Sequence, residues 1–172
     1  TVVRARVTAD GQLDEDDFDR LLARYTGRVA LVAVSAASNV TGLVQPIHRL
    51  ARKAHAAGAH IFVDAAQLVA HRRLDVRADS DPEHLDFVAF SGHKMYAPFG
   101  TGVLIGPREV FRTGDPDYVG GGTVDTVTEE AVTWADLPDR DEAGTPNAIG
   151  AVAIAAAARA LSVWGMDAVH AH

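Results

Sequence analysis

The sequence contains no cysteine, so its 172 residues offer no disulfide, no thiolate metal ligand and no cysteine nucleophile. Basic residues are outnumbered, 16 Lys and Arg against 23 Asp and Glu, and the resulting charge of −7 argues against binding to a nucleic-acid backbone. No apolar run reaches the roughly 18 residues of an ordinary membrane-spanning helix. No basic segment followed by an apolar one marks a secretory signal, and we therefore expect a cytoplasmic protein with a small-molecule site.

Strand-like and helix-like segments alternate along the chain. The expected strands are residues 2–7, 28–36, 60–63, 85–90 and 102–106. The expected helices are residues 14–25, 46–57, a short one from Pro107, and 147–163, whereas residues 114–139 are expected to be mostly loop. The run 28–36 has the continuous apolar pattern of a strand buried on both faces. This order predicts an α/β fold with a mostly parallel sheet and helices on both faces.

Polar residues follow several of these strands directly. Asn39, Asp64, Ser91 and Lys94 each come just after an expected strand. Ligands of open α/β sheets bind outside the carboxyl ends of the strands, so these side chains are expected at one site. A lysine that forms a Schiff base and a carboxylate that keeps a ring nitrogen protonated are what a pyridoxal phosphate enzyme needs.

Each of these residues also has an ordinary structural explanation. Lys94 could be a solvated surface lysine. Asp64 could cap the segment after it, in which case it faces a backbone amide and not a charged ring. Gln67 could turn back and donate to a phenolic oxygen, or be a surface amide. Ser91 and His93 could bind a phosphate, although His93 also fits a structural histidine.

Histidines and glycines elsewhere give weaker signals. His55 and His60 are separated by a helix stop, and no histidine spacing indicates a zinc site, so we expect no metal. Gly120–Gly122 could cradle an anion through backbone amides or be a flexible loop. Thr145 is expected to cap the helix that Pro146 begins, or to bind a phosphate at the start of that helix.

Taken together, these segments resemble the class V aminotransferase family of fold-type I pyridoxal phosphate enzymes, nearest its cysteine desulfurase and selenocysteine lyase branch. The matching segments are residues 38–42, 63–67, 91–102, 120–122 and 142–147. The resemblance implies the large cofactor-binding domain, a three-layer αβα unit, for residues 1–165. Residues 166–172 would begin a connection to a missing C-terminal domain, and we expect the domain to be truncated at both ends.

The resemblance also implies roles for individual residues. Lys94 would be the Schiff-base lysine and Asp64 the partner of the pyridinium nitrogen. Gln67 would contact the phenolic oxygen of the ring, while Ser91 and His93 would bind the phosphate.

Two further contacts follow from the same resemblance. Asn39 would lie beside the ring and the substrate carboxylate. Thr145 would reach the phosphate bound by a neighbouring subunit, which implies a homodimer. The family's sulfur-accepting cysteine and its carboxylate-binding arginine would lie beyond His172.

The implied function is that of a pyridoxal 5'-phosphate enzyme acting on an amino acid, either desulfurase-like or aminotransferase-like, with a sulfur-acceptor protein as partner in the desulfurase case. The alternative is a catalytically incomplete domain of the same fold that serves binding or assembly. Nucleotide binding is disfavoured because no glycine-rich fingerprint follows the first strand.

Overall fold

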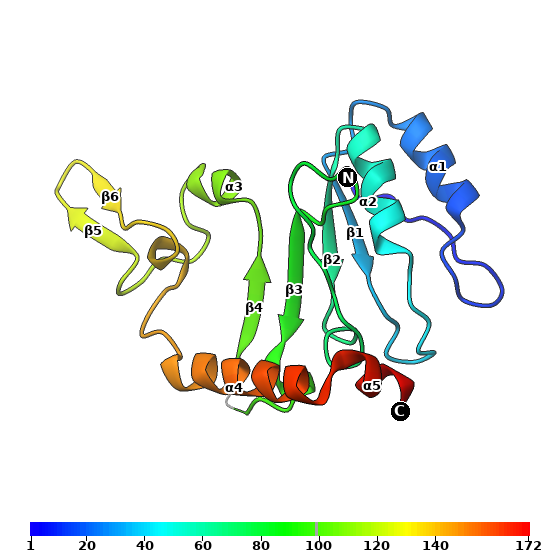
Figure 1. Ribbon diagram of the computed structural model, residues 1–172. Helices are drawn as coiled ribbons and strands as arrows, with labels where there is room; N and C mark the ends of the chain where they lie inside the picture. The colour runs from blue at the N-terminus through cyan, green and yellow to red at the C-terminus, as the bar shows by residue number, and fades with distance from the viewer. Residues whose placement is uncertain (99) are drawn as a thin grey trace.

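The computed structural model describes residues 1–98 and 100–172. Four strands form the main sheet, in the order β1 (Leu31–Ser35), β2 (His60–Asp64), β3 (Phe87–Ser91) and β4 (Gly102–Ile105). β1, β2 and β3 run parallel, and β4 returns antiparallel to β3 (Figure 1). The predicted mostly parallel α/β sheet is confirmed.

Helices and a hairpin surround this sheet. The α-helices are α1 (Glu15–Arg24), α2 (Ile47–Ala56), α3 (Arg108–Arg112), α4 (Ala148–Trp164) and α5 (Met166–Ala171). Two short 3₁₀ helices are η1 (Gly92–Met95) and η2 (Asp139–Asp141), and β5 (Val124–Val127) pairs with β6 (Val132–Trp134) in a separate hairpin. Figure 1 shows α4 lying across the end of the sheet at which β3 finishes.

The core lies between α2 and one face of the sheet. The buried side of α2 consists of Ile47, Leu50, Ala51 and Ala54. It packs in one cluster with Ile61 and Val63 of β2 and Val88 of β3, all three fully buried. Burying a side chain of this size stabilises the fold by about 1.5–3 kcal/mol. On the other face, Phe111 of α3 meets Phe87 edge-on, with ring centroids 6.2 Å apart.

Helix α1 follows from its N-terminal sequence. The Asp14 side chain accepts a hydrogen bond from the amide of Asp17, 2.9 Å away, and three acidic residues occupy the first turn. Both features stabilise the positive end of a helix. Phe18 then anchors the helix to the core.

Two expectations about local structure are wrong. Residues 2–7 form no strand, only an isolated bridge between Val7 and Leu13, because no neighbouring strand of the described chain pairs with them. Within the described residues β1 is not buried on both faces, since Val32 and Val34 are partly buried against the core and Leu31 stays 50% exposed. The expectation that residues 114–139 are mostly loop is confirmed, although this segment also contains the β5–β6 hairpin, whose mostly exposed strands carry no clear apolar alternation.

Helix α4 begins differently from its prediction and packs closely on the sheet end. Its cap is Asn147, whose side chain accepts from the amide of Gly150 at 2.9 Å, so the expected cap at Thr145 is wrong. Leu161 of α4 packs with Met95 of η1 in a second, smaller core cluster. None of the described helices is long and apolar enough to cross a membrane.

Candidate active site

The carboxyl ends of β1, β2 and β3 lie at one edge of the sheet because the three strands are parallel. Ser35 pairs with Asp64, and Asp64 pairs with Ala89. Ser91 is two residues further along β3, roughly 6–7 Å at strand geometry. Asn39 lies in the turn after β1, and Lys94 lies in η1 directly after β3. The three strands therefore end at one edge of the sheet, and Asn39 and Lys94 lie in the segments that follow β1 and β3.

Asp64 ends β2 with its side chain on the face opposite the core. Val63 is fully buried in the core cluster, and successive strand residues point to opposite faces. The Oδ1 atom of Asp64 accepts from the amide of Ala66 at 2.9 Å, which is the cap-like contact considered above. Its Oδ2 atom makes no hydrogen bond with the described residues. One carboxylate oxygen thus holds the turn, and the other is free to accept from a ligand.

Lys94 donates from Nζ to Oε1 of Gln67 at a distance of 3.0 Å. The chain has two lysines, and the other, Lys53, is ion-paired with Glu15 and Asp19. Lys94 is partly buried and forms no ion pair with any carboxylate in the described part of the chain. Among the described residues its polar partner is a neutral amide, so its amine and charge are available to an incoming ligand.

The loop that carries Lys94 is held by its backbone. The amide of Gly92 donates to the carbonyl of Thr101 at 2.7 Å, and the amide of Ala97 returns to the carbonyl of Gly92 at 3.0 Å. Tyr96 has a left-handed backbone with φ of 66°, which is uncommon for a large side chain and is concentrated at functional sites. These contacts fix the position of Lys94 between β3 and β4.

Glycine is required at residue 92 by close packing. A Cβ atom there would lie 2.7 Å from the Ile154 side chain of α4 and 2.9 Å from the Thr101 carbonyl oxygen. Thr101 also ties α4 to the sheet, because Nδ2 of Asn147 donates to its Oγ1 at 3.0 Å. Sequence analysis did not single out Thr101, and only its place between two glycines hinted at a close approach.

The remaining predicted site residues are less closely associated with Lys94. His93 is exposed, and its ring makes no hydrogen bond to a described residue. The glycine-rich loop at residues 120–122 lies beside the segment that precedes α4, since the Gly144 amide donates to the Gly121 carbonyl at 2.8 Å. Thr145 is exposed, and no hydrogen bond recorded for the described chain joins it to Asp64 or Lys94.

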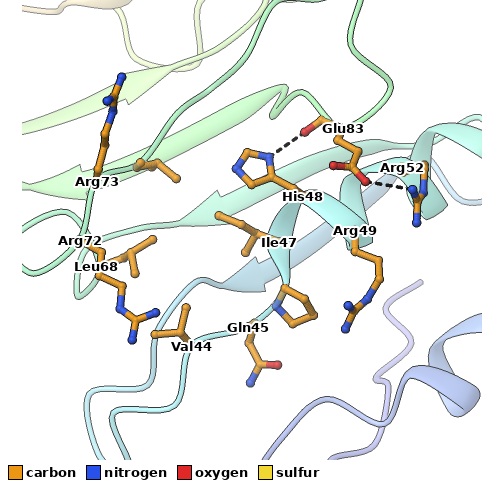
Figure 2. Close-up of a pocket in the computed structure, with 12 residues that line it drawn as sticks. Val44, Gln45, Ile47, His48, Arg49, Arg52, Leu68, Arg72, Arg73 and Glu83 are labelled. Atoms are coloured by element: carbon orange, nitrogen blue, oxygen red, sulfur yellow. Dashed lines mark hydrogen bonds and ion pairs between the residues drawn. The ribbon is translucent and has the colours of Figure 1, made fainter. Parts of the chain in front are cut away.

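A separate, shallow depression of about 520 Å³ lies beside α2 and does not include Lys94 (Figure 2). Its apolar lining includes Val44, Ile47 and Leu68. Arg52 on its rim pairs with Glu83 at 3.1 Å, so part of its positive charge is neutralised. Arginines also occupy residues 49, 72 and 73, and the last two extend in different directions (Figure 2).

Comparison with known proteins identifies relatives of the whole chain. The family model described as aminotransferase class-V matches residues 1–172. A probable cysteine desulfurase 2 of Mycobacterium leprae is 45% identical over 166 residues, which are 96% of this chain and 38% of that protein. A cysteine desulfurase of Haloferax volcanii is 44% identical over 167 residues, 97% of this chain and 38% of that protein.

Solved structures of similar proteins have the same fold. The apo cysteine desulfurase of Thermococcus onnurineus NA1 superposes with a TM-score of 0.84 at 36% identity, over 96% of this chain and 40% of that one. The cysteine desulfurase CsdA of Escherichia coli, in its S-sulfonic acid form, gives a TM-score of 0.83 at 35% identity, over 97% of this chain and 40% of that one. The chain thus spans about 40% of the length of these relatives.

Proposed function

The chain belongs to the class V aminotransferase family, and on that premise we propose that it supplies the pyridoxal 5'-phosphate site of a cysteine desulfurase-like enzyme. The observation that carries the proposal is the contact between Lys94 Nζ and Gln67 Oε1, at the sheet edge where Asp64 ends β2. The proposal assigns residues 1–165 to the large cofactor-binding domain and residues 166–172 to the connection that follows it.

The residues at this edge fit the functional groups of the cofactor. Lys94, an amine with no ion-pair partner among the described residues, suits the aldehyde. Asp64, a carboxylate with one oxygen that accepts no hydrogen bond from them, suits the protonated ring nitrogen. The Gln67 side-chain nitrogen can donate to the phenolic oxygen while its oxygen accepts from Lys94. The Ser91 hydroxyl and the exposed His93 ring, on either side of Gly92, are donors for the phosphate.

When bound, pyridoxal phosphate supplies an electron sink that stabilises negative charge at the α-carbon of an amino acid. Lys94 would hold the cofactor covalently through Nζ and, once released, would accept and return a proton at the substrate α-carbon. Asp64 would keep the ring nitrogen protonated by accepting its N–H. The hydrogen bond from Nζ to Gln67 orients the lysine amine in the interval when it is free.

Two further residues extend the proposed site. Asn39, exposed in the turn after β1, would contact the ring and the substrate carboxylate. Thr145 is exposed and makes no hydrogen bond to its own chain's cluster within the described residues, which supports a role in the phosphate site of a second subunit. The proposal therefore includes a homodimer, cysteine as substrate and a sulfur-acceptor protein as partner.

The test compares the two lysines. Purified protein mixed with pyridoxal phosphate is expected to develop a new near-visible absorbance band. Lys94→Ala is expected to abolish this band. Lys53→Arg keeps the positive charge beside Glu15 and Asp19 and is expected to keep the band. An unchanged absorbance band in Lys94→Ala would refute the assignment of Lys94.

A further inference from the structure

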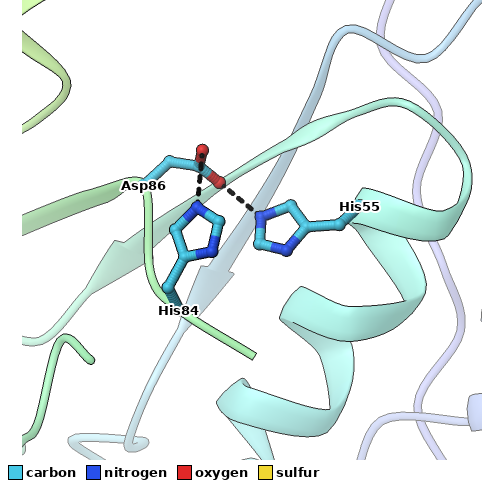
Figure 3. A group of neighbouring side chains, drawn as sticks. All are labelled: His55, His84 and Asp86. Atoms are coloured by element: carbon cyan, nitrogen blue, oxygen red, sulfur yellow. Dashed lines mark hydrogen bonds and ion pairs between the residues drawn. The ribbon is translucent and has the colours of Figure 1, made fainter. Parts of the chain in front are cut away.

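Three histidines surround one buried carboxylate at the end of the sheet opposite Lys94. His60 begins β2, Asp86 immediately precedes β3, and His55 lies in the last turn of α2. Nε2 of His55 is 2.8 Å from Oδ2 of Asp86, and Nε2 of His84 is 3.5 Å from Oδ1 (Figure 3). The nitrogen and oxygen atoms that His55, His84 and Asp86 direct at one another all lie within 4.8 Å.

The outer nitrogens of two of these rings are already in use. Nδ1 of His55 is 2.8 Å from the carbonyl oxygen of Pro82, and Nδ1 of His84 is 2.7 Å from that of Asp81. A carbonyl oxygen only accepts, so both Nδ1 atoms carry hydrogen. In a neutral ring Nε2 then holds a lone pair, and both lone pairs lie next to the Asp86 carboxylate.

That carboxylate is itself an acceptor. It receives the amide hydrogen of Ile61 at 2.8 Å, and Nδ1 of His60 lies 2.6 Å from its Oδ1. The Nε2 atoms of His55 and His84 and the Asp86 carboxylate therefore converge on one region, where a metal ion would take all three as ligands.

The two rings also lie close together. The rings of His55 and His84 are stacked, with centroids 4.2 Å apart and an angle of 20° between planes. One divalent ion would bind both lone pairs and the carboxylate at once.

The distances and surroundings suit such an ion. Donor atoms around tetrahedral zinc are about 3.3 Å apart, and the two observed nitrogen–oxygen distances lie on either side of that value. Hydrogen bonds from the outer ring nitrogens to carbonyl groups are the usual second shell of metal-binding histidines. The Asp86 side chain is only 5% exposed, whereas His60 at 53% lies at the solvent side and leaves a path of entry.

We propose that His55, His84 and Asp86 bind a divalent transition-metal ion of the zinc class through two Nε2 atoms and a carboxylate oxygen. Water or Nδ1 of His60 completes the coordination. The ion links the end of α2 to the start of β3, so it braces the fold at the edge remote from Lys94. Imidazole nitrogens favour Zn²⁺, Co²⁺ and Ni²⁺ over Mg²⁺ or Ca²⁺.

The test is a titration of chelator-treated, cofactor-free protein with Co²⁺, followed by visible absorption, and with Zn²⁺, followed by calorimetry. One ion per chain is expected, together with a rise in melting temperature on addition of Zn²⁺. His84→Ala is expected to weaken binding at least tenfold and to remove the thermal shift. His71→Ala, which removes an exposed imidazole outside the cluster, is expected to change neither.

A second variant distinguishes a loss of metal binding from a loss of folding. His84→Gln keeps a polar side chain of similar length, and circular dichroism reports whether either variant folds. If a folded His84 variant binds Zn²⁺ as tightly as the parent, or if the parent takes up no stoichiometric ion, the metal site is refuted. Neither result depends on pyridoxal phosphate.

Discussion

Replacing Gly92 with alanine is the sharpest test of how α4 positions the lysine loop. The added methyl group would lie 2.7 and 2.9 Å from two atoms of the Ile154 side chain and 2.9 Å from the backbone oxygen of Thr101. The backbone oxygen is part of the contact between β3 and β4 and cannot move freely. Overpacking of this kind costs about 1–3 kcal/mol. At about 2 kcal/mol, the melting temperature of a domain of this size falls by about 4–8 °C.

The matched control is Gly121→Ala. No atom of the described residues lies within 4 Å of a Cβ at Gly121, and its backbone is not left-handed, so a change of less than about 0.5 kcal/mol is expected. The double variant Gly92→Ala/Ile154→Ala tests the cause, because removing the Ile154 side chain relieves one of the two clashes. Its loss of stability is expected to be smaller than the sum of the single losses by about 1 kcal/mol.

Chemical denaturation of five proteins, the parent, the three single variants Gly92→Ala, Gly121→Ala and Ile154→Ala, and the double variant, measures these differences. The reasoning is refuted if Gly92→Ala unfolds at the same denaturant concentration as the parent, or if the two substitutions are simply additive. A Gly92→Ala protein that folds is also expected to bind pyridoxal phosphate more weakly, because Lys94 lies two residues further along the same loop.

Three smaller perturbations probe the rest of the fold. Contacts with Arg49 (3.1 Å) and Lys53 (2.9 Å) lower the pKa of Glu15 from 4.5 to about 2. Glu15→Gln should therefore lower the free energy of unfolding by about 1 kcal/mol at neutral pH, where solvent screens the ion pairs. The difference in stability between parent and variant should shrink as pH falls below 4.5 and vanish near 2. A difference that stays constant during acid denaturation would contradict this. Asp14→Ala removes the α1 cap and should cost about 1 kcal/mol in urea unfolding, whereas Asp14→Asn should restore most of it. Ile61→Ala empties a fully buried position and should cost about 2–5 kcal/mol by the same assay, and a loss below 1 kcal/mol would contradict the core assignment.

The sequence predicts the central sheet well because β2 and β3 carry apolar side chains that face the core. It predicts the edge position of Asp64 and Lys94 for the same reason, since parallel strands bring their carboxyl ends together. The predictions of local structure were wrong where tertiary contacts determine that structure. Asn147 caps α4 in place of Thr145 because its side chain lies beside both Gly150 and Thr101.

The histidine cluster shows a different limit of sequence reasoning. His55 and His84 are far apart in the sequence and have no metal-ligand spacing. They meet because α2 runs back along the sheet and ends near the point where β3 begins, so the last turn of the helix faces Asp86. Side chains brought together by a crossover connection leave no periodic signal in the sequence.

The most direct test of the account is to map where pyridoxal phosphate becomes attached. Borohydride reduction of the cofactor-loaded protein, followed by digestion and peptide mass spectrometry, converts a lysine–cofactor link into a stable secondary amine. The account predicts the added mass on the peptide containing Lys94 and none on the peptide containing Lys53. An adduct confined to Lys53, or no adduct on a folded protein, would contradict it.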